Sequence, residues 1–237
     1  MKKSKKKKVI LGSLFAIFLL GGTFAGFSMF GQNNQNKNNN PQDTLKILDL
    51  LTSPITPNAS AIGDKKANIT LIEFGDYQCQ YCAKFHRETR GQLINNYVAP
   101  GEVRYLFKDF VINDKPDNKA STLAAIGSYC AAEQGKYWDY HDELYSNSKG
   151  ENTPWITQDS LKKFAVNINI PDIVKFSTCL ESQKYSNLVL QNDNLARTIH
   201  LTSTPSFILV TPGKQPLGII GAQPYSVFEQ AINQIKS

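Results

Sequence analysis

The sequence predicts an α/β fold in which strands from both ends of the folded chain enclose a long block of helices. The segment Ile69–Gly75 (ITLIEFG) is almost wholly apolar and rich in β-branched residues, which is typical of a strand covered on both faces. Val103–Phe107 has the same character, and Thr204–Val210 (TPSFILV) returns to it near the end of the chain. Residues 120–200, between these strands, show helical patterns and little strand pattern.

The other elements follow from periodicity and from the breaks that proline and glycine impose. A helical stretch from about Cys79 to Val98 connects the first two strands and ends at Pro100-Gly101, so the fold begins as strand, helix, strand. We expect further helices at Thr44–Leu51, Ser121–Gln134, Tyr137–Ser146, Gln158–Val166, Asp172–Gln183, Asn187–His200 and Tyr225–Ile235, and one more strand at Leu217–Ile220.

The formal net charge of +6 belongs to the N-terminal tail rather than to the folded part. Residues 1–40 hold seven of the 26 basic side chains and no acidic one, so 19 basic and 20 acidic groups remain from Pro41 onward. A nucleic-acid-binding domain needs clustered basic residues on its folded part. We therefore expect no nucleic acid among the partners.

Residues 1–30 are predicted to be a signal-anchor or a signal peptide. Six lysines precede the uncharged run Val9–Phe30, which as a helix would be about 33 Å long and would match a bilayer core. The basic flank should stay cytoplasmic, which places the rest of the chain outside. If the small residues Thr23 and Ala25 mark a cleavage site, the protein is secreted instead. The polar stretch that follows predicts a disordered linker over residues 31–43.

The motif Cys-Gln-Tyr-Cys at residues 79–82 carries the predicted chemistry. Cys79 follows the apolar strand and opens a helix, where free N–H groups and the helix dipole stabilise negative charge. A thiolate is the nucleophile of disulfide exchange, and a lowered pKa both activates it and stabilises the reduced form. Cys82, one turn further along, is expected to be sheltered and to act as the resolving thiol.

Zinc binding is the alternative for this motif, because the same spacing begins many zinc sites and His86 lies four residues beyond Cys82. A zinc site commonly needs a second pair of ligands at knuckle spacing, which the sequence lacks. An external compartment also favours redox chemistry. A zinc-stabilised, membrane-anchored binding module remains the rival class.

Two further positions fit a redox site. Glu73 is a carboxylate inside an apolar strand, where burial should raise its pKa toward the range useful for exchanging a proton with Cys82. The alternative is that Glu73 points outward at a strand end. Pro205 lacks the N–H that would otherwise engage the sulfur or its substrate, although the sequence alone does not predict a cis bond after Thr204.

Three segments in combination resemble the DsbA-type thiol:disulfide oxidoreductases: Ile69–Cys82, Tyr137–Leu144 (YWDYHDEL) and Thr204–Phe207. The resemblance covers roughly residues 60–237. It implies a thioredoxin-like fold with an inserted helical domain, here preceded by an N-terminal membrane helix.

The resemblance also implies domain bounds and site roles. A domain at 44–237 would have thioredoxin-like parts at about 60–118 and 201–237 and a helical insertion at about 119–200. The implied roles are Cys79 as nucleophile, Cys82 as its partner, Glu73 as the buried acid, Lys108 as the basic neighbour of that acid, and Thr204-Pro205 as the cis-proline loop that binds substrate.

The other two cysteines, Cys130 and Cys179, fall in different predicted helices of the insertion. Four cysteines permit three pairings, and pairing Cys79 with Cys82 leaves Cys130–Cys179. Such a bridge could contribute about 4 kcal/mol in the chain-entropy model. A buried pair of free thiols is the alternative, which an oxidising compartment disfavours.

The expected function is that of an extracytoplasmic thiol:disulfide oxidoreductase that exchanges the Cys79–Cys82 disulfide with cysteines of secreted or membrane proteins, above all as a disulfide donor. Isomerisation or reduction by the same fold is the alternative. We expect no cofactor. The expected partners are reduced or unfolded protein substrates, a membrane redox partner that reoxidises the dithiol, and the membrane itself through the N-terminal helix.

Overall fold

The computed structural model describes residues 41–53, 61–151 and 153–237. The predicted signal-anchor or signal peptide and residues 31–40 of the predicted linker lie outside the described residues. The linker was expected to reach residue 43, but helix α1 already begins at Pro41. Within the described ranges, no helix combines the length and the apolar character that crossing a bilayer requires.

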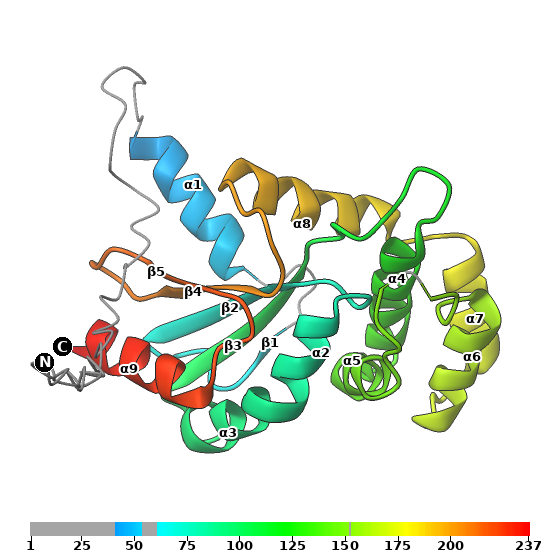
Figure 1. Ribbon diagram of the computed structural model, residues 1–237, viewed down its shortest axis with the longest axis horizontal. Helices are drawn as coiled ribbons and strands as arrows, with labels where there is room; N and C mark the ends of the chain where they lie inside the picture. The colour runs from blue at the N-terminus through cyan, green and yellow to red at the C-terminus, as the bar shows by residue number, and fades with distance from the viewer. Residues whose placement is uncertain (1–40, 54–60, 152) are drawn as a thin grey trace, which may run out of the picture.

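Five strands form one mixed sheet in the order β1-β3-β2-β4-β5 (Figure 1). Strands β2 and β3 run parallel, as a helical crossover between them requires, and the other three pairings are antiparallel. Because β2 lies at the centre, all seven of its residues are buried. The strands are β1 (Ala61–Ile62), β2 (Ile69–Gly75), β3 (Val103–Asp109), β4 (Ser206–Val210) and β5 (Leu217–Ile220).

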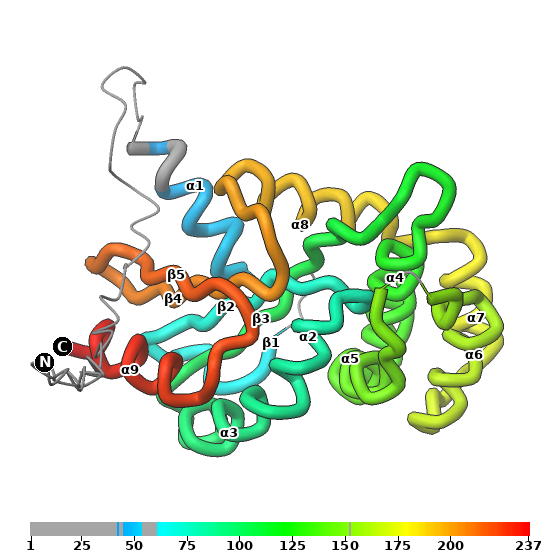
Figure 2. The backbone as a smooth tube through the Cα atoms, viewed as in Figure 1, coloured from blue at the N-terminus to red at the C-terminus, as the bar shows by residue number. Residues whose placement is uncertain are grey.

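Segments that are far apart in the sequence meet in this sheet. Figure 2 shows β2, in cyan, beside β4, in orange, and the register pairs Glu73 with Phe207. The cis-proline loop precedes β4, and the dithiol follows β2. Because the two strands are antiparallel neighbours, the start of β4 and the end of β2 lie side by side at the same end of the strands.

Helices cover both faces of the sheet (Figure 1). One face packs against α9 (Tyr225–Lys236) and against the helical segment behind the dithiol. The opposite face packs against α1 (Pro41–Thr52) and α8 (Ser186–Thr198). The segment behind the dithiol consists of α2 (Gln80–Phe85), the π-helical η1 (His86–Arg90), α3 (Gly91–Leu93) and the π-helical η2 (Ile94–Val98).

A helical lobe adjoins one end of the sheet (Figure 1). Its apolar core includes Cys79, Cys82 and Phe107, so the dithiol lies at the boundary between the lobe and the sheet. The lobe helices are α4 (Ala120–Ala132), α5 (Tyr137–Ser146), α6 (Gln158–Asn167) and α7 (Ile173–Glu181).

Helix α8 departs from the expected arrangement. It falls at the end of the predicted insertion, yet only its first half contributes to the lobe core, through Val189. Leu195 and Ala196 belong instead to the apolar core on one face of the sheet, with Leu106 of β3 and Phe74 of β2. The C-terminal half of α8 therefore covers apolar sheet surface that α1 leaves open.

Candidate active site

The dithiol lies in the turn that connects β2 to α2. The backbone N–H of Cys79 donates to the carbonyl of Asp76 at 3.0 Å, and the carbonyl of Cys79 accepts from Ala83 N–H at 3.1 Å, which is the first hydrogen bond of the helix. Cys79 has extended backbone angles and is the N-cap residue of α2. Both cysteines are free thiols. The strand, turn and helix that the sequence predicts therefore place Cys79 at a helix N-terminus.

The two thiols differ in charge state more than in exposure. Cys79 is only 3 % exposed and Cys82 is fully buried, so Cys79 is less accessible than the sequence suggested. A hydrogen bond from the Cys82 thiol lowers the pKa of Cys79 to about 6, against the effect of burial and with help from Thr204 and the N–H groups of Cys82 and Tyr81. Burial, followed by the neighbouring Cys79 sulfur, raises the pKa of Cys82 well above its ordinary value. Cys79 is therefore the thiolate and Cys82 retains its proton.

Glu73 lies inside the sheet rather than at an outward-facing strand end. It is 1 % exposed, and Oε2 accepts a hydrogen bond from the Tyr105 hydroxyl on β3. Burial raises the pKa of Glu73 to about 7, opposed by the Tyr105 hydrogen bond and by the charge of Arg90. Its charge in turn raises the pKa of Cys82. A carboxyl with this pKa can hold or release a proton near neutral pH.

Lys108 is not the basic neighbour of Glu73, contrary to what the resemblance implied. In the β2–β3 register, Glu73 pairs with Phe107, and Lys108 pairs with Phe74. Because side chains alternate between the faces of a sheet, Lys108 is on the face covered by α1. Its Nζ donates to the carbonyl of Ser53, just past the end of α1, at 2.9 Å. The cation that acts on Glu73 is Arg90 on η1.

The Thr204-Pro205 peptide bond is cis, and its loop contacts the dithiol directly. The Cys79 Sγ lies 3.3 Å from the Thr204 carbonyl oxygen and is placed to donate to it as a thiol. The Pro205 carbonyl accepts from Gly221 N–H at 2.8 Å, which connects the loop to the end of β5. The two predicted halves of the site, 125 residues apart in sequence, are in contact.

Asp76 is a residue of the site that the sequence reasoning missed. One oxygen accepts from the Gln78 N–H at 2.8 Å and from the Ser121 hydroxyl at 2.7 Å, and the other accepts from the Asn113 N–H at 2.9 Å. Burial raises the pKa of Asp76 to about 7 despite these donors. Asp76 thus joins the dithiol turn to α4. Its position directly after the apolar strand could have indicated this role, because a carboxylate there must either face solvent or accept hydrogen bonds from the protein.

Arg90 and Tyr105 were also missed. Arg90 lies eight residues beyond Cys82 in the helical stretch that follows the motif, and Tyr105 is one residue of the second predicted strand. Only the tertiary structure shows that Tyr105 bonds Glu73 and that Arg90 packs over the Tyr105 ring.

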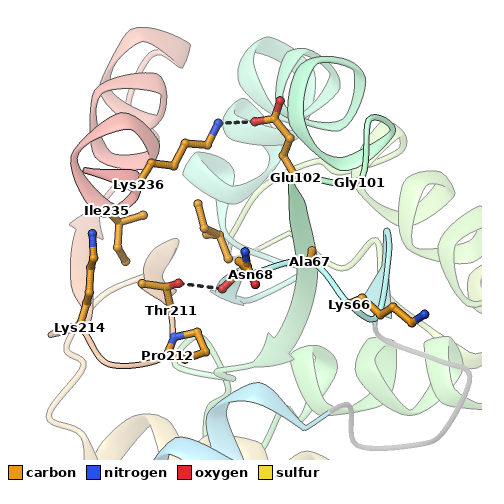
Figure 3. Close-up of a pocket in the computed structure, with 11 residues that line it drawn as sticks. Lys66, Ala67, Asn68, Gly101, Glu102, Thr211, Pro212, Lys214, Ile235 and Lys236 are labelled. Carbon is orange, nitrogen blue, oxygen red and sulfur yellow. Dashed lines mark hydrogen bonds and ion pairs between the residues drawn. The ribbon is translucent and has the colours of Figure 1, made fainter.

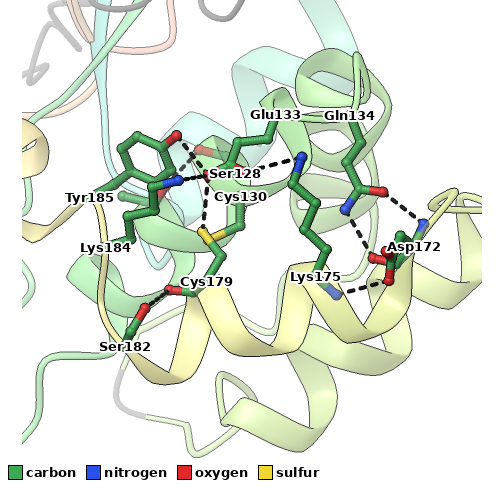
Figure 4. The surroundings of a disulfide bond; sticks show 11 residues. Ser128, Cys130, Glu133, Gln134, Asp172, Lys175, Cys179, Ser182, Lys184 and Tyr185 are labelled. Atoms are coloured by element: carbon green, nitrogen blue, oxygen red, sulfur yellow. Dashed lines mark hydrogen bonds and ion pairs between the residues drawn. A yellow bond between two sulfur atoms is a disulfide. The ribbon is translucent and has the colours of Figure 1, made fainter.

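Cys130 and Cys179 form a disulfide that joins α4 to α7 within the lobe (Figure 4). Beside the bridge, Lys184 Nζ and the Tyr185 hydroxyl both donate to Glu133 Oε1, at 2.7 and 2.8 Å. Both cysteines of the bridge lie on lobe helices, so we assign the bridge to the lobe.

The described residues do not bring a third metal ligand to Cys79 and Cys82, as the alternative zinc hypothesis would require. In the part of the chain that the structure describes, the group with metal-ligand spacing is His86, His141 and Asp142, which includes neither cysteine. The Arg90 guanidinium already contacts the Asp142 oxygen that would face a cation, at 3.1 Å. A fixed positive charge at that oxygen opposes a metal ion.

A cavity of about 670 Å³ lies at the opposite end of the sheet from the dithiol (Figure 3). It is bordered by Asn68 at the start of β2, by Thr211 after β4 and by Lys236 of α9, whose ammonium contacts Glu102. The Thr211 hydroxyl donates to the Asn68 carbonyl at 2.9 Å. The residues that line this cavity include no cysteine, so it is separate from the dithiol site.

Comparisons with known proteins identify the family to which the chain belongs. Residues 56–211 match the family model described as thioredoxin. Disulfide bond formation protein D of Bacillus subtilis is 23 % identical over 157 residues, which cover 65 % of this chain and 68 % of the relative.

Two solved structures share the fold. The oxidised form of BdbD from Bacillus subtilis has a TM-score of 0.66 at 21 % identity, covering 75 % of this chain and 92 % of that one. Wolbachia pipientis α-DsbA1 has a TM-score of 0.65 at 22 % identity, covering 78 % and 94 %. The chain therefore belongs to the thioredoxin family and is a thiol:disulfide oxidoreductase, with the fold of the solved DsbA-type proteins.

Proposed function

We propose that the protein donates its Cys79–Cys82 disulfide to reduced, unfolded protein chains outside the cytoplasm. The observation that carries this direction is the hydrogen-bonded Cys79 sulfur, which the Cys82 thiol and two backbone N–H groups stabilise as a thiolate. A dithiol whose reduced form is stabilised has an oxidising disulfide. The relatives named for disulfide bond formation support the same direction.

The exchange takes two displacements. A substrate thiolate attacks the Cys79 sulfur, the Cys79–Cys82 bond breaks, and Cys82 leaves as a thiolate. A second substrate thiolate then attacks the substrate sulfur of the mixed disulfide and releases Cys79 as a thiolate. The substrate thiols lose two electrons in forming their disulfide, and the enzyme disulfide gains them.

Glu73 supplies the proton that the leaving Cys82 sulfur requires. A buried thiolate at Cys82 is unfavourable, as its strongly raised pKa indicates. Protonated Glu73, with its pKa near 7, transfers a proton to that sulfur and becomes a carboxylate. Reoxidation of the dithiol runs the same transfer backwards, since Cys82 must lose its proton before it attacks.

The Thr204-Pro205 loop is proposed to hold the substrate next to the reacting sulfur. The Thr204 carbonyl lies 3.3 Å from the Cys79 Sγ, and proline has no N–H to compete for that sulfur. A substrate backbone that lies along this loop presents its cysteine to Cys79.

We also propose that the run Val9–Phe30 anchors the domain to the membrane or directs its export, with the dithiol outside the cytoplasm. The lysines before this run and its length support that orientation. An oxidising site of this kind must be reoxidised, and a membrane protein beside the anchor is the proposed partner. Membrane fractionation, with protease added to intact cells, tests this: full-length protein in the soluble cytoplasmic fraction would contradict it.

The direction of exchange is tested by the redox equilibrium with glutathione. A disulfide donor should have a reduction potential toward that of DsbA, about −120 mV, whereas a reductase should approach the thioredoxin value of about −270 mV. Oxidised protein should also form the disulfide of a reduced two-cysteine peptide stoichiometrically. Cys79→Ser should abolish that transfer, and Cys82→Ser should trap the peptide as a mixed disulfide after activation of Cys79.

A further inference from the structure

Arg90 is a buried cation that lies between the redox centre and the surface. Its side chain is 10 % exposed, and its guanidinium lies 5.6 Å from the Tyr105 ring centroid and 5.0 Å from that of Trp138. The Tyr105 hydroxyl donates to Glu73. Arg90 is thus packed against the side chain that bonds the carboxyl of the redox site.

Asp142 on α5 forms an ion pair with Arg90 on the side nearer to the protein surface. Its Oδ1 is 3.1 Å from Arg90 Nη1, 3.2 Å from His86 Nε2 and 2.9 Å from His141 Nδ1. Burial opposes ionisation of Asp142, but the histidine hydrogen bonds and the Arg90 charge hold its pKa well below its usual range. Asp142 therefore remains an anion and keeps the guanidinium between α5 and the sheet.

Arg90 and His86 lie at the two ends of the π-helical segment η1 and reach the same oxygen of Asp142. Residues four apart in a helical segment lie on the same side of it. Arg90 therefore extends beside His86 and packs on the ring of Tyr105, on the sheet face that carries Glu73 and opposite Lys108.

Several titratable groups among the described residues surround Glu73 and Arg90. They are Tyr105 from β3, Cys79 and Cys82 at the start of α2, His86 from η1, and His141, Asp142 and Tyr145 from α5. Burial lowers the pKa of His141 to about 3, so it is neutral. Arg90 is the fixed positive charge in this group.

We propose that Arg90 is a positioning residue of the redox centre, which stabilises the Glu73 carboxylate through Tyr105 and so controls the pH range in which Cys82 gives up its proton. This inference rests on the proposed dithiol exchange and assigns Arg90 a role in the deprotonation of Cys82. An opposite charge near a carboxyl favours ionisation. Loss of Arg90 would keep Glu73 protonated to higher pH and withhold the base that Cys82 needs.

The step to measure is ring closure after reaction with glutathione disulfide. The Cys79 thiolate attacks one sulfur, glutathione leaves as a thiolate, and a mixed disulfide forms on Cys79. Glu73 carboxylate then takes the Cys82 proton, and the Cys82 thiolate attacks the Cys79 sulfur and releases a second glutathione thiolate. The dithiol loses two electrons and glutathione disulfide gains them. Acid quenching and mass spectrometry of the full chain follow the decay of the mixed disulfide from pH 5 to 9.

We expect the wild-type closure rate to rise with a midpoint near pH 7. Arg90→Met should move this midpoint upward by about one pH unit, which makes closure about tenfold slower at pH 6. Arg90→Lys, which keeps the charge, should restore the wild-type midpoint to within a few tenths of a unit. Lys108→Met is the matched control. It removes a buried positive charge from β3, the strand that carries Tyr105, but on the opposite face of the sheet, and we expect no shift in the midpoint of the closure rate.

A double-mutant cycle separates this role from a general structural one. If Arg90 acts through Glu73, Arg90→Met should leave the pH profile of Glu73→Gln unchanged. Equal midpoints in wild type and in folded Arg90→Met, or an equal effect of Arg90→Met in both backgrounds, would overturn the proposal. Should Arg90→Met not fold, Arg90→Gln removes the charge while keeping an amide donor. A wild-type protein that forms no mixed disulfide would instead refute the proposed function.

Discussion

Tyr105 on β3 and Glu73 on β2 form a hydrogen bond across two parallel strands, inside a sheet that helices cover on both faces. The hydroxyl is the donor and Oε2 the acceptor. Burial removes this carboxyl from solvent, and the single hydrogen bond from the neutral Tyr105 hydroxyl does not compensate for that loss. The pKa of Glu73 is therefore raised. The resulting proton affinity near neutral pH is what a thiol:disulfide oxidoreductase needs beside a buried thiol.

Glu73→Gln should make stability less dependent on pH. Because folding raises the Glu73 pKa from 4.5 to about 7, the wild-type protein loses stability as pH rises through that interval. The variant should be more stable than wild type by roughly 2–3 kcal/mol at pH 8, with little difference at pH 4.5. Asp76 and Asp109 shift in the same direction, but they are present in both proteins and cancel in the difference.

Urea unfolding of the oxidised proteins at several pH values measures this difference. The rate of peptide oxidation should fall about 10²-fold in the same variant, at the low end for a proton-transfer group because water can partly substitute. Equal stability and equal rate from pH 5 to 9 would mean that the carboxyl carries no proton for the reaction.

Alkylation of the reduced protein should distinguish the two thiols by pH. Iodoacetamide should label Cys79 with a midpoint near pH 6, whereas Cys82 should stay unlabelled at neutral pH. Since both thiols are buried, we expect slow labelling whose pH profile, rather than its speed, identifies the thiolate. Peptide mapping that finds equal labelling at pH 6 would contradict the separate roles.

The Cys130–Cys179 bridge should stabilise the lobe without tuning the dithiol. Its cysteines are 49 residues apart, and the chain-entropy model gives about 4 kcal/mol for a loop of that size. The double variant Cys130→Ala/Cys179→Ala should therefore lose a few kcal/mol of unfolding free energy and keep the glutathione equilibrium of the Cys79–Cys82 pair. A changed redox equilibrium would show that the lobe bridge is coupled to the site.

Thiol counting provides a second check on the same bridge. From oxidised protein, mild reductant should release two thiols per chain, and reductant with denaturant should release four. Four thiols in denatured, unreduced protein would contradict the pairing.

Lys108→Met should affect stability rather than redox chemistry. Burial lowers the Lys108 pKa from 10.5 to about 8, so the wild-type protein gains stability as pH rises from 8 toward 10.5. The variant lacks this gain, and its stability relative to wild type should decline by a few kcal/mol across that interval. Thermal unfolding at pH 7.5 and 10 tests this, and an altered Cys79 titration would show that Lys108 belongs to the redox site after all.

The sequence by itself determined the parts of this protein that depend on local patterns. The apolar run Ile69–Gly75 is β2 with the same bounds. A strand that is buried on both faces appears in the sequence as a nearly continuous apolar run, so its position can be predicted. Tyr137–Ser146 and Leu217–Ile220 also match their predicted bounds. The position of Cys79 at the start of a helix follows from adjacent segments, so it too was predictable.

The partner strand β1 and the path of α8 were not predictable in this way. β1 is only two residues long, Ala61–Ile62, and is defined by its pairing with Leu106 and Tyr105 rather than by a pattern of its own. The periodicity of α8 indicates an apolar face but not the surface that this face covers. Docking against one face of the sheet is a property of the assembled fold.

Tertiary structure also decided which cation accompanies Glu73. Lys108 and Arg90 both follow the motif in sequence, and no local pattern shows which of them lies beside Glu73. The β2–β3 register turns Lys108 to the α1 face, and the packing of η1 under β3 brings Arg90 to the Glu73 face. A one-residue change of register would exchange the two faces, so the electrostatics of the site depend on strand pairing, which the sequence specifies only through the whole fold.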